Sequence, residues 1–239
     1  MTPATPQGLV NRDQRLLQGQ KARQRCNART CHARIRQQAA TQIIPDPKVL
    51  RYFEFGDRSF LFVCRVSGRT LMDAWVSLSA EWRRYYIGAI VQVCKEAAAW
   101  KGDALAGVDG QCIPERYLTK IGGVKDFSPE SLQRICRGLG MDCANYVFYH
   151  ADLGPGNIIV EDVPKLGTIG IIDWEVAGFF PWGWIRTKFR LCSGMDFEPE
   201  VTDHPDVADE TCCWRREVQR LLGAHGLEDF SGEWMDWWW

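Results

Sequence analysis

The 239-residue sequence has no apolar run long enough to cross a membrane and no recognisable secretory signal. A spanning helix needs about twenty mostly apolar residues, and a secretory signal needs a basic start followed by an apolar stretch. Both absences favour a cytoplasmic protein. The ten cysteines agree with this location, because Cys64, Cys94 and Cys136 fall in apolar segments, where reduced thiols pack as small hydrophobic residues.

The first 42 residues are poor in acid and in glycine. Asp13 is their only acid, they contain no Glu, and their only glycines are Gly8 and Gly19. They hold eight basic residues: Arg12, Arg15, Lys21, Arg23, Arg25, Arg29, Arg34 and Arg36. A basic arm can bind nucleic acid or an anionic membrane, but this one lacks interleaved aromatic residues and any nucleic-acid-binding motif. We expect residues 1–42 to form a solvated basic arm, disordered or helical, without a nucleic-acid partner.

A zinc site is the other function that this arm suggests. Cys26, Cys31 and His32 are close in sequence, and these residue types are zinc ligands. A structural zinc site needs four protein ligands, however, and no second pair follows. We therefore predict no zinc.

The residues that carry chemistry lie in the middle of the chain, in YHADLGPGNIIV at 149–160 and IIDWE at 171–175. Asp152 and Asn157 are five residues apart, and Asp173 follows Asp152 by twenty-one. Kinase-type phosphoryl transfer uses an Asp that orients the substrate hydroxyl, an Asn five residues later that holds magnesium, and an Asp on the next hairpin that holds the bridging metal. The bland alternative is a β-hairpin with solvated acids.

The residues around these three favour the chemical interpretation. The run 147–149 predicts a short strand that leads into the loop, and Gly154 to Gly156 keep this loop irregular, so that Asn157 can turn back toward Asp152. Residues 157–160 and 168–172 predict the two strands of a hairpin. Asp173 then follows the second strand, where its carboxylate can face a shared cleft.

The pattern His-x-Asp-x-x-x-x-Asn followed by Ile-Ile-Asp-Trp-Glu-x-Ala-Gly resembles the aminoglycoside phosphotransferase and choline kinase-like superfamily. The extended form, with IIDWEVAGFFP at 171–181, is most similar to its fungal phosphotransferase-like branch, as are IPDPKVL at 44–50 and the segment 60–71. The resemblance covers residues 43–223. It implies a protein-kinase-like α+β fold with two lobes, in which a β-rich small lobe precedes a mainly helical large lobe.

The resemblance also implies a role for each matching residue. Asp152 would be the catalytic base or hydroxyl-orienting group, and His150 would brace the loop. Asn157 and Asp173 would hold Mg²⁺, and ATP would be the phosphate donor. Ala151 stands where protein kinases carry an Arg that binds a phosphorylated activation loop. The absence of this Arg favours a small-molecule substrate over a protein substrate.

The ATP side of the site departs from the family pattern. A working kinase needs a Gly-rich loop, a strand Lys and a helix Glu that pairs with this Lys. Lys21 lies about where the family places its Lys, but its neighbours do not form an apolar strand pattern, and the Glu is missing. The hinge between the lobes falls at Cys64, Arg65 and Val66, whose backbone groups would hydrogen-bond the adenine.

The rest of the chain predicts strands at 50–55 and 59–63 around a turn. Ser79 and Ser128 predict the starts of two helices. A last helix is expected at about 209–222. We thus expect a small-lobe remnant and hinge at 43–66, a helical large lobe at 67–230 and a Trp-rich tail at 231–239, which would be an exposed end or a truncated element.

We expect the chain to transfer the ATP γ-phosphate to a hydroxyl of a small molecule. The competing hypothesis is a catalytically impaired module that binds a nucleotide or a partner. Acceptor contacts would come from residues after Asp173, among which acids would suit an aminated substrate and aromatic residues a quaternary ammonium. The candidates are Glu175, Trp182, Trp184, Arg186, Lys188, Arg190, Asp196, Glu198 and Glu200. The acceptor and the oligomeric state are left open.

Overall fold

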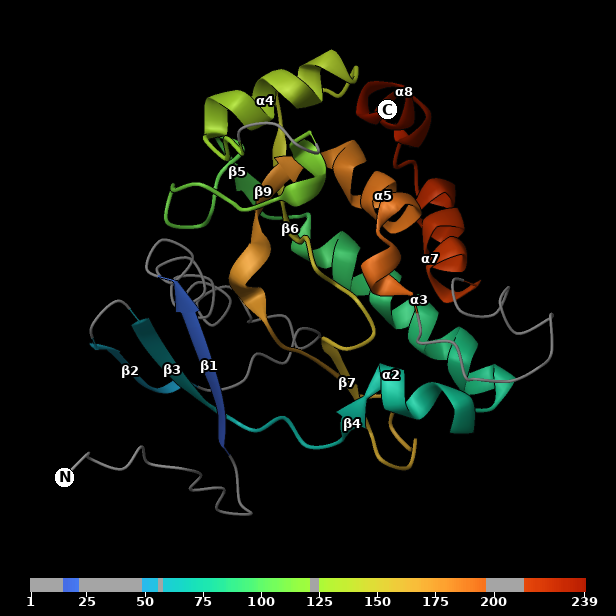
Figure 1. Cartoon of the computed structure of the whole chain (residues 1–239). Helices are drawn as coiled ribbons and strands as arrows, with labels where there is room; N and C mark the ends of the chain where they lie inside the picture. Colours follow the sequence, from blue (N-terminus) through green and yellow to red (C-terminus); the bar gives the residue numbers. More distant parts are fainter. Residues whose placement is uncertain (1–14, 22–48, 56–57, 121–124, 197–212) are drawn as a thin grey trace.

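The computed structural model describes residues 15–21, 49–55, 58–120, 125–196 and 213–239. Figure 1 shows a small sheet at the amino-terminal side and a larger, mainly helical part beyond it. The α+β class expected from the sequence is confirmed. No helix in these ranges is long and apolar enough to cross a membrane.

The small sheet has three antiparallel strands: β1 (Arg15–Lys21), β2 (Val49–Phe55) and β3 (Arg58–Cys64), in the order β1-β3-β2. The β2–β3 hairpin confirms the strands expected at 50–55 and 59–63. Strand β1 differs from the disordered or helical arm expected at 1–42, of which the other residues lie outside the described ranges. The reason is that backbone groups on the free edge of β3 can pair with a strand whatever its side-chain pattern.

Two further sheets carry the central residues. One consists of β4 (Arg69–Thr70), β7 (Ile158–Val160) and β8 (Ile169–Ile171) in the order β4-β7-β8. The other consists of β5 (Lys101–Gly102), β6 (Tyr146–His150) and β9 (Ala177–Pro181) in the order β5-β6-β9. Every residue of β6, β7, β8 and β9 is buried, which is why these strands are continuous apolar runs.

The larger part of the molecule also contains the helices of the described ranges (Figure 1). They are α2 (Leu71–Ala74), α3 (Ala80–Ala97), α4 (Pro129–Gly138), α5 (Trp182–Leu191), α7 (Cys213–Ala224) and α8 (Ser231–Trp238). Single 3-10 turns lie at η1 (Trp75–Ser77), η2 (Arg116–Leu118), η3 (Trp174–Val176) and η4 (Ser193–Met195). The two predicted caps are confirmed, because Ser79 accepts from the Trp82 N–H and Ser128 accepts from the Ser131 N–H.

The carboxyl-terminal end is ordered rather than an exposed tail. Residues 231–238 form α8, in which Trp234 is buried and its indole Nε1 donates to the Tyr117 carbonyl at 2.6 Å. Trp238 stacks on the same Trp234 ring, with 4.5 Å between centroids. Only Trp239 is almost fully exposed among these tryptophans. The indole rings bury apolar surface against the large lobe, and this burial stabilises a helix too short to persist alone.

Candidate active site

The loop after β6 brings Asp152 and Asn157 together. The Gly154 N–H donates to the Asp152 carbonyl at 2.8 Å, and the Asn157 N–H donates to the Gly154 carbonyl at 3.0 Å. These two bonds fold the loop tightly, so that Asn157 Nδ2 donates to the Asp152 carbonyl at 2.8 Å and to its carboxylate Oδ2 at 3.2 Å. The amide oxygen of Asn157 therefore remains available as an acceptor or metal ligand.

His150 joins this loop to the hairpin that follows. Its Nε2 lies 2.9 Å from the Ile172 carbonyl, and its Nδ1 accepts from the Asp152 N–H at 3.3 Å. The side chain is buried, and its ring meets the Trp174 ring edge-on at 4.7 Å. Burial lowers the pKa of His150, so the neutral ring is favoured, with its proton on Nε2. This geometry suits a bracing residue rather than a proton donor.

Asp173 has the features of a metal ligand without a partner. It is the only non-glycine residue with positive φ in the described ranges, at φ 62° and ψ 61°. Its Oδ1 is buried and has no hydrogen-bond partner among the described residues. Burial, and secondarily the negative charge of Asp152, raise the pKa of Asp173. A buried carboxylate in the field of a second one is unfavourable unless a cation joins them.

The donor set here fits magnesium in its chemistry. The Asp173 carboxylate and the Asn157 amide oxygen are hard oxygen ligands, which Mg²⁺ prefers and which it usually supplements with water and phosphate oxygens. No group of three or more His, Cys, Asp or Glu side chains able to hold a metal occurs in the part of the chain that the structure describes. The candidate site is therefore a sparse one that would need a phosphate ligand to complete the shell of the ion. Cys26, Cys31 and His32, for which no zinc site was predicted, lie outside the described residues.

The hinge contacts the same hairpin. Val66 is half-buried, and a Cβ added to Gly170 of β8 would lie 2.5 Å from Val66 Cγ1. Gly68 has φ 119°, and a Cβ there would lie 2.1 Å from the Val160 carbonyl oxygen. Cys64 ends β3, and Arg65 follows it exposed. The backbone stretch expected to bind adenine thus leads directly onto the strands that carry the metal-ligand candidates.

The register of the small sheet places Lys21 away from this hinge. Arg15 pairs with Cys64 at the hinge end of β3, whereas Lys21 pairs with Arg58 at its other end. Six residues of strand correspond to about 20 Å. The structure therefore places the backbone of Lys21 at the end of the sheet remote from the hinge, and its side chain lies outside the described part.

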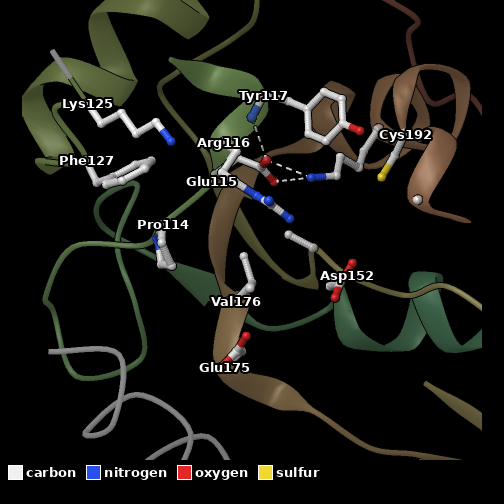
Figure 2. Close-up of a pocket in the computed structure, with 13 residues that line it drawn as sticks. Pro114, Glu115, Arg116, Tyr117, Lys125, Phe127, Asp152, Glu175, Val176 and Cys192 are labelled. Carbon is white, nitrogen blue, oxygen red and sulfur yellow. Dashed lines mark hydrogen bonds and ion pairs between the residues drawn. The ribbon is translucent and has the colours of Figure 1, made fainter. Parts of the chain in front are cut away.

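A cavity of about 370 Å³ opens beside Asp152. Figure 2 shows it between the segment that contains η2, the loop after β6 and helix α5. Asp152 comes from the loop after β6, Glu175 and Val176 come from η3, and Lys125 and Phe127 come from the segment before α4. A hydroxyl bound in this cavity could donate a hydrogen bond to Asp152.

A buried ion pair forms one wall of the cavity. Lys188 Nζ lies 2.6 Å and 2.7 Å from the two carboxylate oxygens of Glu115, and both side chains are at most 5% exposed. Trp184 Nε1 also donates to Glu115 at 3.4 Å, and the Lys188 ammonium lies 4.4 Å from the centre of the Tyr117 ring. Such a pair is rigid, because separating it would leave a buried charge unpaired.

Sequence reasoning missed Glu115, which lies 73 residues before its partner. A usable signal was Lys188 itself, the one cation among the buried residues of α5. Among the acceptor candidates after Asp173, Glu175 and Lys188 line the cavity. Trp184 is a core residue, Asp196 pairs with Arg215, and Glu198 and Glu200 lie outside the described residues.

Comparison with known proteins locates the fold. No protein-family model matches the sequence, and no curated protein matches it significantly. Solved structures do match. Aminoglycoside phosphotransferase APH(4)-Ia superposes with a TM-score of 0.54 at 15% identity, over 87% of this chain and 70% of that one. APH(3'')-Id from Streptomyces rimosus, in complex with ADP and streptomycin, superposes with a TM-score of 0.53 at 15% identity, over 93% and 85%.

A third structure agrees. A thermostable APH(4)-Ia mutant, in a ternary complex with AMP-PNP and hygromycin B, has a TM-score of 0.53 at 18% identity, over 87% of this chain and 70% of that one. At these identities the likeness concerns the fold. The chain has the kinase-like fold of the aminoglycoside phosphotransferases, as the catalytic-loop motif implied.

Proposed function

We propose that this chain, which has the aminoglycoside phosphotransferase fold, transfers the γ-phosphate of ATP to a hydroxyl group of a small molecule. The observation that carries the proposal is the proximity of two carboxylates, one of which is held by an amide. Asn157 donates to Asp152, and the charge of Asp152 contributes to the raised pKa of Asp173, whose buried Oδ1 has no partner among the described residues. This arrangement is unfavourable in the empty protein and becomes favourable with a cation.

Each residue then has one task. Asp152 would accept a hydrogen bond from the acceptor hydroxyl and orient its oxygen toward the phosphate. Asn157 and Asp173 would hold Mg²⁺, which when bound neutralises the phosphate charge. His150 would fix the loop through the Ile172 carbonyl and the Asp152 N–H. Because phosphoryl transfer asks little covalent chemistry of the protein, such positioning accounts for most of the catalysis.

The second candidate is a module that binds nucleotide without catalysis. The absence of any Glu in residues 1–42 favours it, because the phosphate-binding Lys of a kinase normally pairs with a helix Glu. The small sheet also presents Lys21 at the end remote from the hinge. Nucleotide binding is common to both candidates, and only phosphate transfer separates them.

The test is a thermal-shift titration with ATP and Mg²⁺, followed by measurement of ADP formation. A ligand that binds only the folded chain stabilises it by RT ln(1 + [L]/Kd), about 2.7 kcal/mol at a hundredfold excess over Kd. We expect a magnesium-dependent stabilisation that Asp173→Asn abolishes. Asp152→Asn should keep this stabilisation and lose acceptor-dependent ADP formation.

The matched control is Asp162→Asn. Asp162 is exposed in the β7–β8 connection, so the same chemical change there should alter neither quantity. No stabilisation at millimolar nucleotide would refute phosphate transfer from ATP and would leave only a module that binds a partner instead of a nucleotide. Stabilisation that depends on Asp173, without phosphate transfer to any hydroxyl compound, would favour the non-catalytic module.

A further inference from the structure

The charges that line the cavity beside Asp152 are separated by sign. The lining contains six charged side chains: Glu115, Arg116, Lys125, Asp152, Glu175 and Lys188. Figure 2 shows Asp152 and Glu175 on the lower side of the cavity, and Lys125 on the opposite, upper side. Arg116 lies between them, with its side chain directed into the cavity.

The Glu115–Lys188 pair cancels its own charge. Its atoms are 2.6 Å and 2.7 Å apart and buried, so neither group is available to pair with a ligand. The pair acts as a neutral wall. The positive charges that remain are those of Lys125, on the upper side, and of Arg116, between the two sides (Figure 2).

Arg116 and Lys125 are both exposed at the cavity. Neither has an ion-pair partner among the described residues, in contrast to Lys188, Arg215 and Arg220. A polycation bound here would bring its ammonium groups against two uncompensated cations, which is unfavourable. An anionic group would meet a guanidinium and an ammonium, the usual partners of carboxylates and phosphates.

The negative side of the cavity is the side of the proposed chemistry. Asp152 would bind the acceptor hydroxyl, and the field of Asp152 and Glu175 would be offset there by Mg²⁺. A cavity of about 370 Å³ lies at the lower end of the range of roughly 300–1,000 Å³ for ligand pockets. It suits a compact molecule with its hydroxyl and its anionic group at opposite ends.

We infer that the acceptor of this chain is a compact hydroxylated acid, whose carboxylate or phosphate group is bound by Arg116 and Lys125. This inference rests on the proposed phosphotransferase function. It assigns Arg116 and Lys125 as specificity-determining residues. It also separates this chain from the neighbours crystallised with streptomycin and hygromycin B, and it replaces the aminated acceptor that the acids after Asp173 suggested.

A matched series of six-carbon polyols tests the inference. Gluconate, glucitol 6-phosphate, glucitol and glucamine carry a carboxylate, a phosphate, no charge and an ammonium on similar chains. Binding is measured calorimetrically without nucleotide, and acceptor-dependent ADP formation is measured with it. At low ionic strength we expect at least one of the two acids to bind roughly tenfold more tightly than glucamine, since each exposed pair contributes a factor of a few. The preference should shrink at high salt.

Two double variants complete the test. Arg116→Gln with Lys125→Gln should remove the preference for acids. Arg84→Gln with Lys165→Gln removes the same net charge at exposed positions outside the cavity, and should retain it. The comparison of gluconate with glucitol 6-phosphate tells which anion is preferred.

The outcomes separate this inference from the proposed function. A chain that binds ATP and Mg²⁺ but shows no preference for either acid, or binds none of the four probes, overturns the inference alone. Equal loss of preference in both double variants also overturns it, because a general field and not these two residues would then be responsible. Acid binding that needs Arg116 and Lys125, in a chain that binds no nucleotide, refutes the phosphotransferase function and leaves an anion-binding cavity.

Discussion

Two three-stranded sheets in this molecule differ in how firmly they are held. In β4-β7-β8, all the residues of β7 and β8 are buried. In β1-β3-β2, Leu61 alone is buried among the hydrophobic side chains that the structure describes. The exposed fractions of Leu50, Phe53 and Phe55 are 46%, 36% and 78%. Local stability follows buried apolar contact. The end of the site that contains Asn157 and Asp173 should therefore be rigid, and the sheet expected to cover the nucleotide should open more readily.

The largest expected effect comes from the rigid end. Trp174→Ala removes a ring that is 1% exposed, stacks on Phe148 and donates from Nε1 to the Ile171 carbonyl at 3.1 Å. We expect the free energy of unfolding to fall by about 3–5 kcal/mol, as for other buried Trp-to-Ala changes. Urea unfolding measures it. Trp239→Ala, at a position 93% exposed, is the control and should change little; a similar loss in both would contradict the comparison.

The next effect concerns Gly68, in the segment that connects β3 of the small sheet to β4. Gly68→Ala forces a side chain onto φ 119° and against the Val160 carbonyl, so we expect a loss of about 1–3 kcal/mol. Two controls separate the causes. Gly110→Ala adds a Cβ in open space at φ 75° and reports backbone strain alone, while Gly88→Ala in α3 meets no atom and should stabilise the helix. A cost at Gly68 no greater than at Gly110 would show that the close contact with β7 is unimportant.

A smaller effect, of opposite sign, is expected at Asp173. The folded state raises the pKa of Asp173 above its ordinary value of 3.8, so the folded chain binds this proton more tightly than the unfolded chain does. Its contribution to stability is then present below about pH 3.8 and is lost as the pH rises through the folded pKa. Without metal, Asp173→Asn should raise the melting temperature at neutral pH, and the gain should disappear in acid.

With magnesium and nucleotide, the wild type should instead melt at a higher temperature than Asp173→Asn, because these ligands stabilise the wild type and not the variant. Differential scanning fluorimetry over a pH series, beside Asp162→Asn, measures both parts. A variant less stable than the wild type at neutral pH without metal would show that the Asp173 carboxylate has a protein partner.

The smallest effect is expected in the small sheet. Phe55→Ser changes a side chain that is 78% exposed at the end of β2, so the free energy of unfolding should change by less than about 0.5 kcal/mol. Leu61→Ala, in the neighbouring strand, is the buried counterpart. If Phe55→Ser costs as much as Leu61→Ala, Phe55 is covered by something, and the two sheets differ less than their exposures indicate.

Sequence reasoning succeeded where the determining contacts are short in range. The Gly154–Gly156 loop, the β7–β8 hairpin and the caps Ser79 and Ser128 all depend on residues within about twenty positions, and their signals are local. The left-handed backbone of Asp173 has no such signal. The conformation belongs to the turn by which the chain passes from β8 into η3, and the residue at this turn is Asp173 rather than a glycine.

Sequence reasoning failed where the residues in contact are far apart in the sequence. Glu115 is explained only by Lys188, 73 residues later, and α8 is held by a hydrogen bond between Trp234 and Tyr117, 117 positions apart. Strand β1 pairs through its backbone with β3, which no side-chain pattern announces. The cavity beside Asp152 is assembled from such distant segments. Its charge distribution could therefore be obtained only after the fold was known.

The left-handed conformation of Asp173 has an evolutionary consequence. The left-handed region costs most non-glycine residues roughly 1–2 kcal/mol and costs Asp and Asn less, and here a buried carboxylate without a partner among the described residues adds to the cost. A lineage without the proposed magnesium site would gain stability by exchanging this residue for Gly, which adopts the conformation freely, or for Asn, which tolerates it as Asp does and removes the buried charge. Position 173 is therefore where relatives that lack the proposed activity should diverge first, ahead of His150 and Trp174, whose replacement would damage the core.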